Sequence, residues 1–308
     1  MKLSLTRLPR LPFLRLSRAQ PVPASGQPRG LSESWQAFLR NPSGLAGLFS
    51  LLAIVAIAAF ANVLFPGDPL DMVAEPLLWP FTSAEAPLGS DSLGRNVAAG
   101  LAHGARVSLA VGAVAAVISL IIGITVGATA GYFGGRIDDI LVRITELFQT
   151  VPTFLFVIVI VAIGQPSIGV IVLAIGLAAW PVIARLVRAE FRWLRESEFV
   201  QAARSQGFSD LRIIFQEILP NALPPVIVTT SVLVASAILI ESALSFLGMG
   251  DPNQVSWGSM IGEGRELLRT AWYLTALPGL AIVLSVLALN LVGDALNDAF
   301  NPRLRGTR

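Results

Sequence analysis

The sequence has no cysteine, a single histidine and few charged residues among its 308 positions. Without cysteine the chain has no disulfides, no catalytic thiolate and no Cys-ligated metal site. His103 has no second histidine to join it in a metal centre or a catalytic triad, and we expect it to be a loop residue. Charged residues make up 14% of the chain and hydrophobic residues 54%, whereas globular domains average about 25% charged. This composition predicts an integral membrane protein without a catalytic or metal site built on cysteine or histidine.

Six apolar segments are candidates for membrane spans, which need about 17 to 25 residues. They cover residues 44–65, 107–132, 151–164, 168–186, 223–247 and 275–296, and the third is the shortest. The predicted fold class is therefore an all-α integral membrane protein with six transmembrane helices.

The positions of Lys and Arg predict the orientation of these spans, because cytoplasmic loops carry the excess of positive charge. If the N-terminus is cytoplasmic, eighteen Lys and Arg residues fall on the inner side and four on the outer side. Both termini and the loop 187–222 are therefore predicted to be cytoplasmic. The formal charge of +2 reflects this topology and gives no indication of nucleic-acid binding.

Residues 1–43 form a basic, Pro-rich segment that we expect to be a partly disordered cytoplasmic tail. An organelle transit peptide is the alternative, but no small-residue cleavage site precedes the first span. Trp35, Phe38 and Leu39 recur at helical spacing and predict a short interfacial helix over 34–40. The remaining divisions are 44–105 for the first span and outer loop, 106–297 for the core transmembrane domain, and 298–308 for a cytoplasmic C-terminal tail.

Glycine recurs at every fourth position in and just after the second span, at Gly123, Gly127, Gly131 and Gly135. Such a stripe lies along one helical face and lets a neighbouring backbone approach closely. A flexible hinge is the alternative, but the strict spacing favours helix packing.

The loop 187–222 has the pattern of a short helix, a glycine turn and a second helix. Ser197 is expected to cap the first helix, and Gly207 is expected to end it with a positive φ. The second helix carries an apolar stripe and leads to a fifth span that is expected to begin near Pro224 and Pro225. That stripe consists of Leu211, Ile214, Phe215 and Ile218. A helix pair of this kind either rests on the bilayer or is bound by a soluble partner.

Two further groups of residues are candidates for functional roles. In the acidic outer loop, Asp91 and Arg95 are spaced to pair across one helical turn, and a structural clasp is favoured over a substrate contact. Polar and ionisable residues inside spans are candidates for a substrate path. In the fifth span these residues are Thr229, Thr230, Ser236 and Glu241, although Glu241 could instead brace neighbouring helices.

Four separated motifs extend these observations. They read LGSDSLGRN at 88–96, QAARSQGFSDLRIIFQEILP at 201–220, ESALSFLGMG at 241–250 and GDALNDAFNPRLR at 293–305. In order and placement they resemble the motifs of ABC-transporter permease subunits for binding-protein-dependent import, in the dipeptide/oligopeptide/nickel family. The coupling loop departs from the family pattern at Gln201, where Glu is usual, and at Glu217, where Ile is usual.

The resemblance implies a type I ABC importer permease fold and assigns roles to individual residues. The outer-loop signature comprises Asp91, Gly94 and Arg95, and the ATPase-coupling residues are Gln201, Ala202, Ala203, Gly207, Asp210, Leu219 and Pro220. It also implies a multi-pass protein of the bacterial inner membrane that forms a heterodimer with a second, homologous permease. Two ATPase subunits and an extracytoplasmic solute-binding protein complete the implied assembly, within membrane lipid.

The chain contains no GxxxxGK[ST] phosphate-binding loop, so it is expected to be a transport subunit and not an enzyme. ATP and Mg²⁺ are expected on the partner ATPases, and no cofactor on this chain. The expected cargo is a peptide or a related small solute, with nickel and opines left open. A proton-coupled secondary transporter that uses Glu241 and Asp294 is the alternative. An intramembrane enzyme is poorly supported, because the spans contain no Cys or His.

Overall fold

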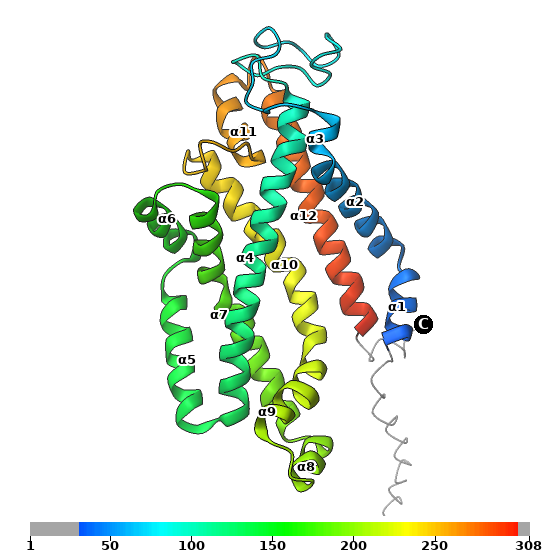
Figure 1. Ribbon diagram of the computed structural model, residues 1–308, viewed down its shortest axis with the longest axis vertical. Coiled ribbons are helices and arrows are strands. Elements are labelled where there is room, and N and C mark those ends of the chain that lie inside the picture. The colour runs from blue at the N-terminus through cyan, green and yellow to red at the C-terminus, as the bar shows by residue number, and fades with distance from the viewer. Residues whose placement is uncertain (1–30, 301–308) are drawn as a thin grey trace, which may run out of the picture.

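The computed structural model describes residues 31–300, and within that range the chain is built from helices without a β-sheet (Figure 1). This confirms the predicted all-α class. The helices are α1 (Leu31–Leu39), α2 (Pro42–Ala59), α3 (Ala61–Leu64), α4 (Val97–Phe133), α5 (Gly135–Thr150), α6 (Thr153–Gly164), α7 (Ile168–Arg195), α8 (Glu198–Ser205), α9 (Asp210–Arg212), α10 (Leu219–Phe246), α11 (Trp257–Gly264) and α12 (Tyr273–Phe300).

Five helical stretches in the described range are long and apolar enough to cross a membrane, and a bent helix pair makes a sixth if it is one span. The five include α2, α4, α7 and α12, together with the continuous run Asp210–Phe246. The third predicted span, 151–164, is too short to cross a membrane alone and counts as a span only together with α5. It is α6, whose 12 residues cover only about 18 Å of a hydrocarbon core about 30 Å thick. The charged helix α5 precedes α6 and meets it at 81°.

Several helices extend beyond their apolar segments. Helix α4 begins at Val97 and α12 runs to Phe300, so the predicted domain boundaries at 106 and 298 fall inside helices. Helix α7 passes the predicted end at residue 186 and continues to Arg195. Hydropathy marks where the chain leaves the lipid, but a backbone helix continues as long as its hydrogen bonds and its packing against neighbours persist.

Helices α4 and α7 pack closely along the predicted glycine stripe. A Cβ at Gly123 would lie 2.6 Å from the Ile183 Cβ, and one at Gly131 would lie 2.6 Å from the Phe191 Cβ. Gly127 has its nearest neighbours in the same helix α7. The packing prediction is thus confirmed for these three glycines and wrong for Gly135, which follows the end of α4, has a φ of +52° and has no neighbour within 4 Å of a Cβ.

The N-terminal helix α1 includes the predicted interfacial helix and begins a few residues earlier, at Leu31. Trp35 stacks on Phe38, and Phe38 is buried against Ala295 and Ala299 of α12. Helix α1 is therefore held by protein contacts as well as by any contact with lipid. The predicted tails at 1–30 and 301–308 lie outside the described residues.

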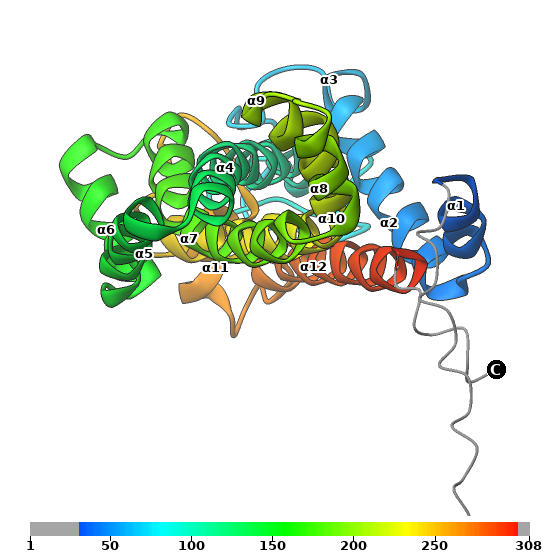
Figure 2. The same cartoon turned by 90° about the horizontal axis from the view of Figure 1, so that it is seen from below.

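Two loop systems lie at opposite ends of the long axis of the molecule (Figure 1). The segment between α3 and α4 lies at one end together with α11, and α8 and α9 lie at the opposite end. The view from below places α8 and α9 in front of the helical bundle, with α5 and α6 on one side and α1 and α2 on the other (Figure 2). The segments that carry the predicted coupling residues and the predicted outer-loop residues therefore lie at opposite ends of the bundle.

Candidate functional site

The coupling loop, defined here as residues 196–220, starts with α8, which ends in a Schellman motif centred on Gly207. Gly207 N–H donates to the Arg204 carbonyl at 2.9 Å, and Phe208 N–H donates to the Ala203 carbonyl at 3.2 Å. Gly207 has a φ of +78°, as the sequence predicted. Ser197 occupies the N-cap position, but its hydroxyl donates to the Leu194 carbonyl and does not cap α8.

The second helix of the coupling loop is not a separate element, contrary to the sequence prediction. Helix α9 passes into a π-helical turn, Ile213–Ile218, and that turn passes directly into α10. Pro224 and Pro225 lie inside α10 and do not mark its start. A helix tolerates proline inside a span when nearby groups satisfy the freed carbonyls, and the π turn relaxes the backbone just before Pro220. The loop is therefore one end of a continuous helical run of 37 residues, Asp210–Phe246.

The π turn also changes which side chains of the coupling loop are buried. Ile213, Ile214 and Ile218 are buried, whereas Leu211 is 66% exposed and Phe215 60% exposed. The predicted stripe of Leu211, Ile214, Phe215 and Ile218 is wrong, because it assumed a period of 3.6 residues through a segment that is wider than an α-helix. Two large apolar side chains consequently face outward from this end of the bundle.

Helix α8 presents one of its two predicted alanines to the surface. Ala202 is exposed, whereas Ala203 packs into the apolar cluster that includes Phe191 and Leu194 of α7. Consecutive helical residues point about 100° apart, so Ala202 and Ala203 do not share one face of α8. Four more of the predicted coupling residues are exposed, and Leu219 is half-buried. The exposed four are Gln201, Gly207, Asp210 and Pro220.

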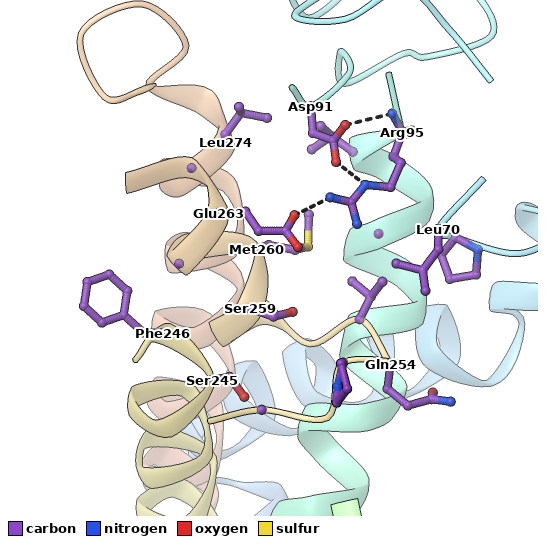
Figure 3. A pocket seen from close by; sticks show the side chains of 18 of the residues that line it. Leu70, Asp91, Arg95, Ser245, Phe246, Gln254, Ser259, Met260, Glu263 and Leu274 are labelled. Carbon is purple, nitrogen blue, oxygen red and sulfur yellow. Dashed lines mark hydrogen bonds and ion pairs between the residues drawn. The ribbon is translucent and has the colours of Figure 1, made fainter. Parts of the chain in front are cut away.

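At the opposite end, Arg95 pairs with two acidic residues, Asp91 four residues before it and Glu263 in the distant helix α11 (Figure 3). Its Nε lies 2.6 Å from the Asp91 Oδ2, and its Nη2 lies 2.7 Å from the Glu263 Oε2 of α11. The pairing of Asp91 with Arg95 is confirmed, but the local structure is a turn and not a helix. Asp91 Oδ1 accepts from the N–H groups of Leu93 and Arg95, and Gly94 has a φ of +82°.

This ion cluster lines a pocket of about 330 Å³ between the outer loop, the start of α4 and α11 (Figure 3). Burial raises the pKa of the Glu263 carboxyl, and the adjacent Arg95 guanidinium partly offsets that rise. Sequence spacing missed Glu263, because it lies 168 residues from Arg95. Tyr273 anchors the same loop through its hydroxyl, which donates to the Leu78 and Ser90 carbonyls at 2.7 and 2.9 Å. The geometry supports the clasp interpretation of this end.

The four predicted path residues of α10 do not form one lining. Glu241 is 2% exposed and accepts from Ser245 Oγ at 2.7 Å and from Ser108 Oγ of α4 at 3.2 Å. The Ser108 hydroxyl in turn accepts from Trp257 N–H of α11, so Glu241 ties three helices together. Thr229 and Thr230 donate to carbonyls of their own helix, and Ser236 is exposed. The bracing alternative fits Glu241, and a path role stays a prediction for the other three.

Comparisons with known proteins agree with this architecture. Residues 123–306 match the family model of the binding-protein-dependent transport system inner membrane component. Residues 31–88 match the N-terminal TM domain of oligopeptide transport permease C.

Curated relatives cover nearly the whole chain. The di/tripeptide transport system permease protein DppC of Pseudomonas aeruginosa is 39% identical over 92% of this chain and 95% of its own length. The dipeptide transport system permease protein DppC of Escherichia coli K12 is 41% identical over 89% and 94%, respectively. A solved structure of the MetNI methionine ABC transporter in inward-facing conformations aligns with a TM-score of 0.54 at 18% identity. That alignment covers 66% of this chain and 96% of the other, and it shows a shared fold.

The described residues form a helical bundle with five stretches long and apolar enough to cross a membrane, and the chain belongs to the family of inner-membrane components of binding-protein-dependent transport systems. Within that family it is a permease of the ABC importer class, in the peptide branch that contains the DppC relatives. The proton-coupled alternative finds no support in these relatives. Glu241, one of the two carboxylates that it requires, is engaged in helix bracing.

Proposed function

We propose that this chain is the permease subunit of an ATP-driven importer for di- and tripeptides. The identity of 39–41% to dipeptide and di/tripeptide permeases, over about nine-tenths of the chain, carries this proposal. In the proposed assembly a second, homologous permease completes the translocation path. Two ATPase subunits bind and hydrolyse ATP with Mg²⁺, an extracytoplasmic binding protein delivers the peptide, and no cofactor binds to this chain.

The exposed apolar side chains of the coupling loop support its proposed contact with an ATPase subunit. Leu211 and Phe215 are exposed near the start of the long helical run, and Phe199 of α8 is 40% exposed. Trp193, near the end of α7, is 73% exposed. Apolar groups of this size at the charged end of a bundle, among Arg192, Arg204 and Arg212, are typical of a protein interface.

The continuity of this helical run suggests how the ATPases would drive transport. Because α9, the π turn and α10 form one uninterrupted helical run, a displacement of the coupling loop moves the span itself. Closure of the ATPases on ATP would then tilt α10 and the helices packed on it between inward-open and outward-open arrangements. This is a rigid-body form of alternating access.

The charge asymmetry predicts the orientation of this chain in the inner membrane, with the coupling loop and both termini in the cytoplasm. Because the chain has no cysteine, single substitutions give unique labelling sites. We expect a membrane-impermeant maleimide to label Glu85→Cys and Gln254→Cys on intact spheroplasts, and Gln206→Cys only after permeabilisation. All three positions are exposed, so the result depends on the side of the membrane on which each position lies. Labelling of Gln206→Cys from outside would overturn both the orientation and the coupling role.

Uptake into proteoliposomes tests the proposed cargo and energy source. The complex of both permeases and two ATPases is reconstituted with the binding protein outside, and tritiated dialanine serves as the probe. We expect accumulation that requires ATP on the ATPase side and that a protonophore does not reduce. Accumulation driven by a proton gradient without ATP would instead establish the secondary transporter. ATP-driven uptake of Ni²⁺ without dialanine uptake would reject the peptide cargo and keep the importer.

A further inference from the structure

Tyr132 lies at the end of α4 nearest the coupling loop and is almost completely buried, with 5% of its surface exposed. It belongs to an apolar cluster that includes Phe191 and Leu194 of α7 and Val200 and Ala203 of α8. One aromatic residue of a membrane span is therefore enclosed by the helix before the coupling loop and by the loop itself.

Polar contacts connect Tyr132 to three successive parts of the chain. Its hydroxyl donates to the Asp210 Oδ1 of α9 at 2.6 Å. Its backbone carbonyl accepts from Nη1 of Arg195, the last residue of α7, at 3.0 Å. The Arg204 guanidinium of α8 lies 5.5 Å from the ring centroid, within the range of a cation–π interaction. Both helices of the loop and the end of α7 thus meet at Tyr132.

The bond to Asp210 differs from the other loop contacts in being directional and charge-assisted. It joins the coupling loop to the end of α4, where the Arg204 guanidinium of α8 also lies near the same tyrosine. Apolar contacts such as those of Val200 and Ala203 can slide as the loop moves, whereas a hydrogen bond to a carboxylate holds its partners in one geometry. Helix α4 in turn packs on α7 through Gly123, Gly127 and Gly131.

We propose that Tyr132 is a positioning residue that makes the coupling loop and α4 move as one body, through its hydrogen bond to Asp210. Displacement of the loop would then reach the α4–α7 pair as well as α10, which the loop moves through chain continuity. This inference rests on the proposed function only in that nucleotide-driven motion enters through the coupling loop.

Distance measurements on the assembled complex test the proposal without a transported solute. Spin labels are placed at Gln206→Cys in the loop and Val117→Cys in α4, both exposed and both unique in this cysteine-free chain. Double electron–electron resonance compares the nucleotide-free complex with the complex trapped by ATP and vanadate, using cysteine-free partners. We expect the wild-type distance to be the same in both states. A wild-type distance that changes between them would overturn the proposal.

Tyr132→Phe keeps the ring, its burial and its position near Arg204, and removes only the hydroxyl. We expect its distance distribution to shift or broaden on trapping, and Asp210→Ala to have the same effect. The double variant should shift the distance distribution no further than either single variant. Asp210→Asn should keep the wild-type distance in both states, because its amide oxygen still accepts the hydrogen bond from the Tyr132 hydroxyl. Tyr273→Phe is the matched control, since it is the same change in the only other tyrosine of the chain, at the opposite end of the bundle.

Uptake of dialanine per assembled complex gives a second readout. We expect it to fall about tenfold in Tyr132→Phe, as for the loss of a hydrogen bond to a charged group. Unchanged distances in both Tyr132→Phe and Asp210→Ala would refute the proposal. If Tyr132→Phe does not assemble, Asp210→Ala decides, measured only on complexes that retain both ATPases, because Asp210 is also one of the predicted ATPase-coupling residues. A wild-type complex that takes up no dialanine would reject only the proposed cargo, because the distance measurement does not depend on it.

Discussion

Gly127→Leu is expected to reduce the yield of folded chain by about tenfold or more, the largest effect on stability that we predict. A Cβ at Gly127 would lie 2.5 Å from the Ala184 carbonyl oxygen and 2.8 Å from the Val187 Cβ. The carbonyl belongs to the backbone of α7, so no rotamer change can relieve the contact. The leucine side chain would have to separate two helices that are also in close contact at Gly123 and Gly131.

The measurement is the monodisperse yield in detergent, together with the midpoint of thermal aggregation. Gly279→Leu in α12 is a matched control, because no atom lies within 4 Å of a Cβ at that position. Gly127→Ala should fall between the two, since its Cβ alone already meets the carbonyl. Equal yields for Gly127→Leu and Gly279→Leu would show that α4 and α7 are not packed as described.

The contrast between Gly127 and Gly135 shows what periodicity can predict. A repeat of four residues places glycines on one helical face, and three of them do meet a neighbouring helix. The repeat does not reveal that α4 ends at Phe133, because the end depends on the positive φ of Gly134 and Gly135. Neither does it identify α7 as the partner, which is a property of the three-dimensional arrangement.

Hydropathy alone does not predict that the third span is broken into α5 and α6. Helix α5 carries charged residues that interrupt an apolar window, among them Asp138, which pairs with Arg188 of α7 at 2.7 Å. A charge satisfied by a neighbouring helix is acceptable at a depth where an isolated charge is costly. The bend of 81° follows at Val151 and Pro152, where proline interrupts the helix. Composition could locate the apolar part of this pair but not its angle to the rest.

At both the coupling-loop end and the outer-loop end, local sequence could predict some of the functional residues and not others. Gly207 and the Asp91–Arg95 pair are local features, and both were predicted. Tyr132 and Glu263 were missed, because their partners Asp210 and Arg95 lie 78 and 168 residues away. A buried tyrosine needs a partner for its hydroxyl, so Tyr132 near the end of a span was the available signal for a contact of this kind.

Gly207→Val is expected to abolish transport while leaving insertion into the membrane nearly normal. The φ of +78° is a conformation that costs ordinary residues about 1–2 kcal/mol and β-branched residues more. Loss of the Schellman turn would reorient α8 relative to α9, although each membrane span keeps its own backbone hydrogen bonds. Transport should therefore fail and association with the ATPase should weaken, while the chain remains in the membrane.

A series at this position separates backbone strain from side-chain size. No atom lies within 4 Å of a Cβ at Gly207, so volume alone should have no effect on the folded chain. Asn tolerates positive φ better than Ala, and Ala better than Val, so activity per membrane-inserted chain should decrease in the order Gly, Asn, Ala, Val. Uptake and co-purification of the ATPase, each normalised to inserted chain, provide the test. If Asn is as damaging as Val, the ATPase must contact this position directly, because only steric exclusion by a partner would ignore the difference in φ preference.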